Sequence, residues 1–181
     1  MNKRISLQEL RNGGYIFYTR HAQATVGNDQ FMLDFTDCST QRNLSETGRE
    51  QAIRYGEALR RLNIPIFIPV IASPFCRARE TAALAFGEGN VRVDSFWADV
   101  YRLSLNITEA EKDSTLQRLQ HLFEMEVPSG KNAVVAAHSF PPHIGLGELA
   151  DMETVIIHPF GSNNGFRIIG RIQLEDWERN I

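Results

Sequence analysis

The chain of 181 residues lacks the features that mark several large classes of protein. It has no uninterrupted apolar run of the roughly 18 residues that a membrane-spanning helix needs. It also has no basic excess, because 19 lysines and arginines stand against 22 aspartates and glutamates, a formal net charge of -3. Nucleic acids and anionic membranes attract basic surfaces, so we expect neither as a partner.

Cysteine is scarce, with only Cys38 and Cys76 present. Two free thiols in a reducing cytosol are the simpler interpretation, and a disulfide is the alternative. The first residues carry the basic pair Lys3-Arg4 but no apolar segment of the kind found in a secretory signal. We therefore expect a cytoplasmic protein, with a secreted mature form as the alternative.

The overall composition is that of an ordinary globular domain. Hydrophobic residues make up 43% and charged residues 23%, and the length fits one core of normal depth. We predict a single domain over residues 1–181. No pattern indicates an oligomeric state.

Apolar runs alternate with amphipathic segments along the chain. Strands are expected at residues 15–19, 91–93 and 133–137, with a connected pair at 154–157 and 166–169. Residues 64–72 carry a further strand, which Pro65 and Pro69 confine to a late start. Helices are expected at residues 5–11, 45–62 and 73–86, and from a capping box at Thr108 onward, whereas residues 94–106 are expected to be irregular. This order predicts a three-layer α/β/α sandwich with a mostly parallel sheet and an antiparallel edge.

Chemically active side chains follow three of the expected strands. Arg20 and His21 follow the first, and His138 follows the strand at 133–137. Arg77 lies shortly after the strand that ends near residue 72. Ligands of open α/β sheets bind outside the carboxyl ends of the strands, so we expect these side chains to meet there. Arginines in a mildly acidic protein favour a small anionic ligand.

Residues 23–42 form a stretch of about twenty residues without sustained periodicity. In a compact domain such a stretch is usually a functional loop. Its apolar residues Phe31, Met32 and Phe35 are expected to form the rim of the pocket and to influence substrate choice.

Four blocks of sequence resemble the histidine phosphatase superfamily, also called phosphoglycerate mutase-like. Arg20-His21-Ala22 resembles the Arg-His-Gly of that family, and residues 44–52 resemble its Leu-Thr-x-x-Gly-x-x-Gln-Ala. Residues 73–82 are similar to its Ser-x-x-x-Arg-Ala-x-x-Thr-Ala, and residues 134–138 correspond to the strand with the second histidine. The chain is identified as a small, single-domain, bacterial-type member. Alanine replaces glycine after His21, which matters only if that backbone needs a positive φ.

The resemblance implies a role for each matching residue. His21 is the expected nucleophile, since a neutral imidazole with one nitrogen held as an N–H donor can attack phosphorus and form a phosphohistidine. Arg20 and Arg77 are expected to clamp the phosphoryl oxygens, and a protonated His138 to donate a further hydrogen bond. Ser139 is a further candidate for substrate binding. The resemblance implies no metal and no cofactor.

The proton donor to the leaving oxygen is less clearly indicated. The acid phosphatase branch places an aspartate directly after the second histidine, but Ser139 stands there, so that branch is not expected. In mutase-like members the acid lies after the second arginine block, where this chain has Asp99. We take Asp99 as the candidate general acid. Asp29, Asp34 and Asp37 on the long loop are its competitors.

The expected function is a phosphomonoester hydrolase acting on a small phosphate ester or a phosphoprotein. A phosphoglycerate mutase-like phosphotransferase is one alternative, and a weakly active phosphate-binding regulatory module is another. A metal site built from His138, His143 and His158 is a third interpretation. It is disfavoured because Pro141-Pro142 breaks any helical spacing between the first two.

Overall fold

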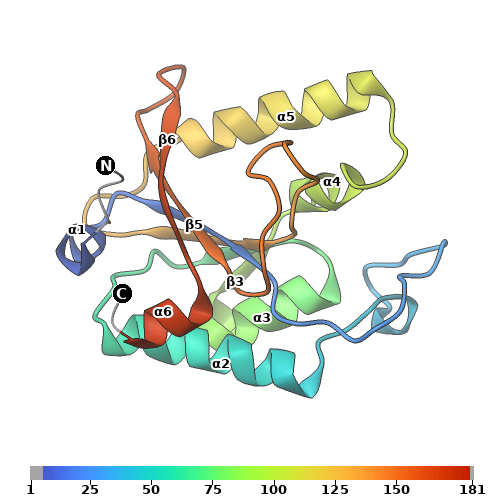
Figure 1. The fold of residues 1–181 in the computed structure, drawn as a ribbon, viewed down its shortest axis with the longest axis horizontal. Helices are drawn as coiled ribbons and strands as arrows, with labels where there is room; N and C mark the ends of the chain where they lie inside the picture. The colour runs from blue at the N-terminus through green and yellow to red at the C-terminus, as the bar shows by residue number, and fades with distance from the viewer. Residues whose placement is uncertain (1–5, 180–181) are drawn as a thin grey trace.

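A computed structural model describes residues 6–179 of the chain, and its core is a six-stranded sheet (Figure 1). The strands, in the order of the sheet, are β3 (Val91–Val93), β2 (Val70–Ala72), β4 (Ala133–Ala137), β1 (Ile16–Arg20), β5 (Thr154–Pro159) and β6 (Phe166–Ile172). The first four strands of this order are parallel, whereas β5 and β6 run antiparallel along one edge. The predicted sheet is therefore confirmed.

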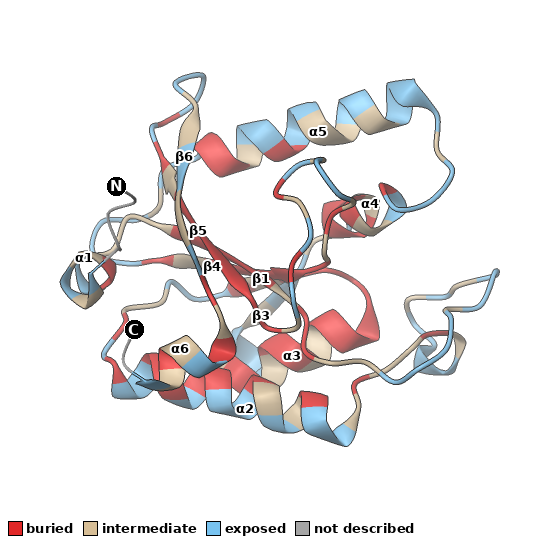
Figure 2. Cartoon of the chain, viewed as in Figure 1, coloured by how far each residue is buried: buried red, intermediate tan, exposed pale blue. Residues whose placement is uncertain are grey.

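Helices cover both faces of the sheet (Figure 1). One face carries α2 (Glu46–Arg61), α3 (Cys76–Phe86) and α6 (Leu174–Arg179), and the other carries α4 (Phe96–Arg102) and α5 (Glu109–Glu124). The short α1 (Leu7–Asn12) lies before the first strand. Two apolar cores follow from this layering, one on each face of the buried sheet (Figure 2). The expected three-layer sandwich is confirmed.

Local signals in the sequence place most helix ends. Ser45 caps α2 by accepting a hydrogen bond from the Gly48 amide, and Thr108 and Glu111 form the expected capping box of α5. Ser6 caps α1, whose predicted range begins at Ile5, outside the described residues. None of the helices in residues 6–179 is long and apolar enough to cross a membrane.

Two local expectations are wrong. Residues 96–102 form α4 instead of an irregular segment, and helix α3 begins at Cys76, three residues later than expected. The second strand starts late, as Pro65 and Pro69 predict: it covers only Val70–Ala72, because proline lacks the N–H that a central ladder needs. Helix α6 lies beyond the elements that the sequence predicts.

The interpretation of Cys38 and Cys76 as free thiols is also wrong. The two residues form a disulfide. Cys38 belongs to a single 3₁₀ turn, Cys38–Thr40, in the long loop, and Cys76 is the first residue of α3. The bond therefore fastens the loop of residues 23–42 to the helix that carries Arg77.

Candidate active site

His21 leaves the end of β1 with its imidazole buried and its two nitrogens in different surroundings. Nδ1 lies 2.7 Å from the carbonyl oxygen of Ala22, which can only accept, so Nδ1 carries the ring proton. Nε2 then presents its lone pair and accepts a hydrogen bond from Nε of Arg77 at 3.2 Å. Burial, with the nearby charge of Arg77, lowers the pKa of His21 to about 3. The ring is therefore neutral at physiological pH, as a nucleophile must be.

Alanine at position 22 fits this arrangement without strain. Ala22 is fully buried, and it is not among the residues with positive φ in the described chain. Its amide donates to Oγ1 of Thr81 at 3.1 Å, and that hydroxyl donates to the carbonyl of Arg77. The motif threonine on α3 thus joins the backbone beside His21 to the backbone of the clamp arginine.

His138 lies at the end of β4, beside His21. The strands β1 and β4 pair in parallel with Arg20 opposite Ala137, and the two imidazole centroids are 5.5 Å apart. The Ser73 hydroxyl, at the end of β2, lies 2.7 Å from Nε2 of His138. The other ring nitrogen, Nδ1, is buried and has no partner. Burial and the neighbouring positive groups lower the pKa of His138 well below 6.5.

Arg77 is the most enclosed charged side chain of the site, with 2% of its side chain exposed. Its guanidinium lies over the ring of Phe75 at 4.4 Å, and it contacts His21 through Nε. Its two terminal nitrogens donate to the two carboxylate oxygens of Asp29 at 2.8 and 3.1 Å. One guanidinium therefore connects the reactive imidazole to a carboxylate of the long loop.

Arg20 lies beside the same strand ends and has polar partners on one side only. One terminal nitrogen donates to the carbonyl of Leu149 at 2.7 Å, and the other lies 3.2 Å from a carboxylate oxygen of Asp151. Its Nε is buried without a partner. Among the described residues three buried side-chain nitrogens lack a hydrogen bond, and two of them, Arg20 Nε and His138 Nδ1, belong to this site. Buried polar atoms normally have hydrogen-bond partners, so these two nitrogens are candidates for contact with a bound ligand.

The block at residues 44–52 holds the start of the long loop. A Cβ added at Gly48 would lie 2.0 Å from the carbonyl oxygen of Gln23, so only glycine allows α2 to approach the loop this closely. Ser45 donates to the Gln23 side chain at 2.8 Å, and Gln51 accepts from the Gln23 amide at 3.0 Å. The block therefore fixes the chain two residues after His21.

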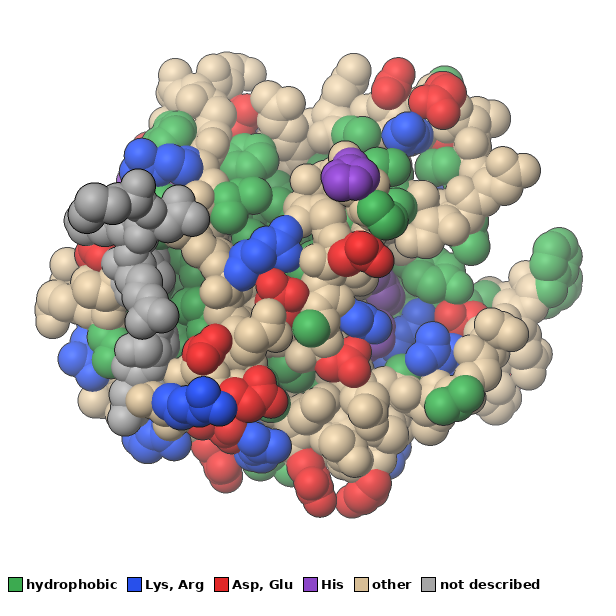
Figure 3. Space-filling model, viewed as in Figure 1, with side chains coloured by type: hydrophobic (Ala, Val, Ile, Leu, Met, Phe, Trp, Pro, Cys, Tyr) green, Lys and Arg blue, Asp and Glu red, His purple; other side chains and the backbone are tan. Residues whose placement is uncertain are grey.

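The loop then folds over the site. Asp29 has only 6% of its side chain exposed, and Gln41 accepts from the Cys76 amide at 2.9 Å beside the disulfide. Figure 3 shows basic and histidine side chains gathered in a hollow next to this projecting loop, at the right of the view. Phe31 and Met32 are 103% and 81% exposed, so their expected place on the pocket rim stays a prediction. Phe35 instead packs on Phe75.

Two further candidate residues, Asp99 and Ser139, have side-chain partners outside this group. Asp99 has 39% of its side chain exposed and pairs with Arg102, and none of its described contacts is with His21, Arg77 or His138. From the same helix it is Tyr101 that reaches the site, where its hydroxyl donates to Asp29 at 3.0 Å. Ser139 is occupied by its own loop, because its Oγ accepts from the Leu149 amide at 2.9 Å.

The metal-site interpretation gains no support from the structure. Within residues 6–179 no group of three or more histidine, cysteine, aspartate or glutamate side chains is arranged to hold a metal ion. His143 lies in a turn with a positive φ, and His158 packs against Tyr15 and Phe160 in β5.

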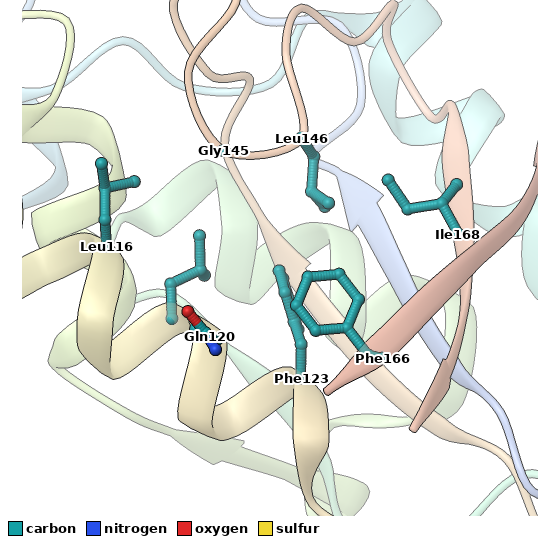
Figure 4. Close-up of a pocket in the computed structure, with 8 residues that line it drawn as sticks. Leu116, Gln120, Phe123, Gly145, Leu146, Phe166 and Ile168 are labelled. Atoms are coloured by element: carbon teal, nitrogen blue, oxygen red, sulfur yellow. The ribbon is translucent and has the colours of Figure 1, made fainter. Parts of the chain in front are cut away.

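An apolar cavity of about 140 Å³ lies elsewhere, between α5, β6 and the loop at Gly145 (Figure 4). Leu116, Phe123 and Phe166 line it, and Gln120 is its one polar side chain. None of its lining residues is titratable, so this cavity offers no acid, base or nucleophile.

Comparison with known families agrees with three of the four sequence blocks, those at residues 20–22, 44–52 and 73–82. Residues 16–100 match the family model described as the histidine phosphatase superfamily, branch 1. This confirms the resemblance inferred from the sequence for the part of the chain that holds Arg20, His21 and Arg77. A comparison with curated proteins found no match.

Solved structures share the fold over most of the chain. A phosphoserine phosphatase from Entamoeba histolytica, in complex with 3-phosphoglyceric acid, is 13% identical with a TM-score of 0.57, and the match covers 88% of this chain and 96% of that one. The protein histidine phosphatase SixA complexed with tungstate is 12% identical with a TM-score of 0.51, over 90% of this chain and 98% of that one. A mycobacterial glucosyl-3-phosphoglycerate phosphatase is 19% identical with a TM-score of 0.54, over 86% and 97%. At these identities the likeness concerns the fold.

Proposed function

We propose that this chain, with the fold and the sequence blocks of histidine phosphatases, hydrolyses phosphomonoesters through a covalent phosphohistidine on His21. The observation that carries the proposal is the state of that imidazole. Its Nδ1–H is held by the Ala22 carbonyl and its Nε2 lone pair faces the Arg77 guanidinium. An unprotonated imidazole nitrogen beside a guanidinium that can bind phosphoryl oxygens is suited to nucleophilic attack on a phosphoryl group.

The surrounding nitrogens supply an anion-binding set. Arg20 Nε and His138 Nδ1 are buried without partners, and the Arg77 fork is planar and always charged. When the Ser73 hydroxyl donates to Nε2 of His138, the ring proton resides on Nδ1 and is available to a phosphoryl oxygen. Phosphate charge beside the ring also favours its protonation. Ser73 is thus a positioning residue for His138.

The reaction proceeds in two displacements. Nε2 of His21 forms a bond to phosphorus as the bond to the ester oxygen breaks, and a proton joins the leaving oxygen. Water then attacks the phosphohistidine, the P–N bond breaks with its electron pair returning to Nε2, and inorganic phosphate leaves. Charge on the phosphoryl oxygens is balanced by the guanidinium groups throughout.

We specify the substrate only as a phosphate ester, either a small molecule or a phosphoprotein. The structural neighbours act on phosphohistidine, phosphoserine and a glucosyl phosphoglycerate, and this variety supports phosphate recognition without selecting among the three. A mutase-like phosphotransferase and a weakly active phosphate-binding module are the alternatives.

The expected cytoplasmic location agrees poorly with the Cys38–Cys76 disulfide, because disulfides persist mainly in oxidising compartments.

Hydrolysis of p-nitrophenyl phosphate by wild type and by His21→Ala tests the proposal. We expect the variant to lose at least about a thousandfold in kcat/KM, since removal of a catalytic nucleophile has effects of this size or larger. Equal rates would exclude His21 as the nucleophile. Normal phosphate binding without turnover in the wild type would favour the binding module, and transfer of the phosphoryl group to a sugar acid instead of water would favour the mutase.

A further inference from the structure

Asp29 is the one carboxylate of the long loop that reaches the reactive group. It lies eight residues after His21, yet only 6% of its side chain is exposed. Besides the two nitrogens of Arg77, it accepts from the Arg42 amide at 2.8 Å and from the Tyr101 hydroxyl at 3.0 Å. Groups from the loop, α3 and α4 thus converge on this carboxylate.

A single guanidinium separates Asp29 from the nucleophile. Arg77 donates through Nε to His21 and through both terminal nitrogens to Asp29. Carboxylate and phosphate suit the same planar fork. A phosphoryl group that approaches Nε2 of His21 therefore competes with Asp29 for Arg77. The displaced carboxylate stays next to the guanidinium, and the guanidinium is the group that holds the reacting phosphoryl oxygens.

This competition reverses the charge environment of Asp29. Burial opposes its ionisation, but the hydrogen bonds from Arg77 and Arg42 and the charge of Arg77 outweigh burial and hold the pKa of the carboxyl below its ordinary value. Once phosphate takes the fork, the carboxylate loses its cation and faces a second anion in an enclosed place. Both changes raise its affinity for a proton.

We propose that Asp29 is the general acid of the reaction, released from Arg77 and protonated when the substrate phosphate binds. As the P–Nε2 bond forms and the ester P–O bond breaks, the carboxyl proton passes to the leaving oxygen. In the second step the Asp29 carboxylate takes a proton from the water whose oxygen bonds to phosphorus. When phosphate leaves, Asp29 releases this proton to solvent and its carboxylate returns to the ion pair with Arg77.

Other carboxylates near the site are placed less favourably. Asp99 is paired with Arg102 on the outer side of α4. Asp34 and Asp37 are engaged by amides and hydroxyls of their own turns. Asp151 pairs with Arg20 through one contact at 3.2 Å and has 29% of its side chain exposed, which makes it the main rival.

The inference rests on the proposed function. Substrates with different leaving groups distinguish a failure of the inference from a failure of the proposed function. Good leaving groups need little protonation, whereas alkoxides need an acid. We therefore compare kcat/KM for p-nitrophenyl phosphate, phenyl phosphate and glycerol 3-phosphate in wild type, Asp29→Asn, Asp151→Asn, Asp99→Asn and His21→Ala. Asp113→Asn, an exposed site on α5, is the matched control.

Asp29→Asn is expected to lose at least about a hundredfold on glycerol 3-phosphate and only a few-fold on p-nitrophenyl phosphate. Inhibition by vanadate should remain as strong or become stronger, because the competing carboxylate charge is gone; this also shows that the variant is folded. His21→Ala should lose activity on all three substrates, and its failure to do so would overturn the proposed function itself.

Three results would overturn the role of Asp29 alone. Equal losses on all three substrates in Asp29→Asn would mean that Asp29 has a structural role. Faster turnover with tighter vanadate binding in this variant would mean that Asp29 only blocks the phosphate site. A leaving-group-dependent loss in Asp151→Asn or Asp99→Asn, with none in Asp29→Asn, would assign the acid to that residue instead.

Discussion

Cys38 is bonded to Cys76, the residue directly before Arg77 in the chain. The bond joins the loop that carries Asp29 to the helix that carries the buried guanidinium. The ion pair between Asp29 and Arg77 is a second contact between the same loop and helix, and it lies beside His21. Loop and helix are therefore held together by one covalent and one ionic contact, and the geometry of the phosphate site depends on both.

Removal of the disulfide should destabilise the protein. Cross-links over loops of this length, a sequence separation of 38 residues, typically contribute about 2–4 kcal/mol. Urea unfolding with and without a thiol reductant measures the effect, and the Cys38→Ser/Cys76→Ser double variant, which should not respond to reductant, is the control. Rapid alkylation of both cysteines in the native, unreduced wild type would show that the bond is absent.

Arg77→Lys should abolish the clamp without unfolding the protein. Lysine keeps the charge but cannot donate to His21 and to a phosphoryl group from one planar fork, so we expect a loss of about 10²–10³-fold in kcat/KM. Arg79→Lys is the matched control, because Arg79 lies two residues further along α3 and contacts only the disulfide sulfurs in the described hydrogen bonds. Similar losses in both variants would contradict a specific role for Arg77.

Gly48→Ala should lower the free energy of unfolding. The new Cβ would meet the Gln23 carbonyl at 2.0 Å, so either α2 or the backbone after His21 must shift, at a cost of about 1–3 kcal/mol. Gly89→Ala serves as the control, because nothing lies within 4 Å of a Cβ at that position and its φ is not positive. Chemical denaturation of both variants gives the comparison. If Gly48→Ala left the free energy of unfolding unchanged, the approach of α2 to the loop would be looser than described.

Stability should fall as the pH is lowered from about 6.5. Burial lowers the pKa of His21 to about 3 and that of His138 well below 6.5, so in this range both histidines bind protons in the unfolded chain but not in the native one. The free energy of unfolding then decreases by up to about 1.4 kcal/mol per pH unit for each histidine. Unfolding curves from pH 7.5 to 4.5 measure the slope, and His138→Asn should flatten it. A slope unchanged by the substitution would contradict the neutral, buried state of His138.

The sequence reveals those parts of the site that local pattern encodes. Apolar runs that end at Arg20 and at residue 137 predict which side chains emerge at the carboxyl ends of the strands. The structure brings His21, Arg77 and His138 together there. Capping residues place α2 and α5 for the same local reason.

Contacts between distant segments escape such patterns. Ser73 and His138 are 65 residues apart and Asp29 and Arg77 are 48 apart, and neither pairing leaves a local signal. The disulfide depends on the same meeting of loop and helix. Asp99 was expected in an irregular segment, whereas residues 96–102 form α4, from which Tyr101 and not Asp99 reaches the site. Phe96, Trp97 and Val100 are buried at helical spacing and could have revealed this helix.

The central claim is a covalent bond between phosphorus and Nε2 of His21, and trapping that bond tests it most directly. Enzyme mixed with a ³²P-labelled aryl phosphate and quenched within milliseconds in alkali should retain label on a peptide that contains His21, whereas an acid quench should release it, because phosphoramidates hydrolyse in acid. Label that survives acid, or label retained by His21→Ala, would contradict the account.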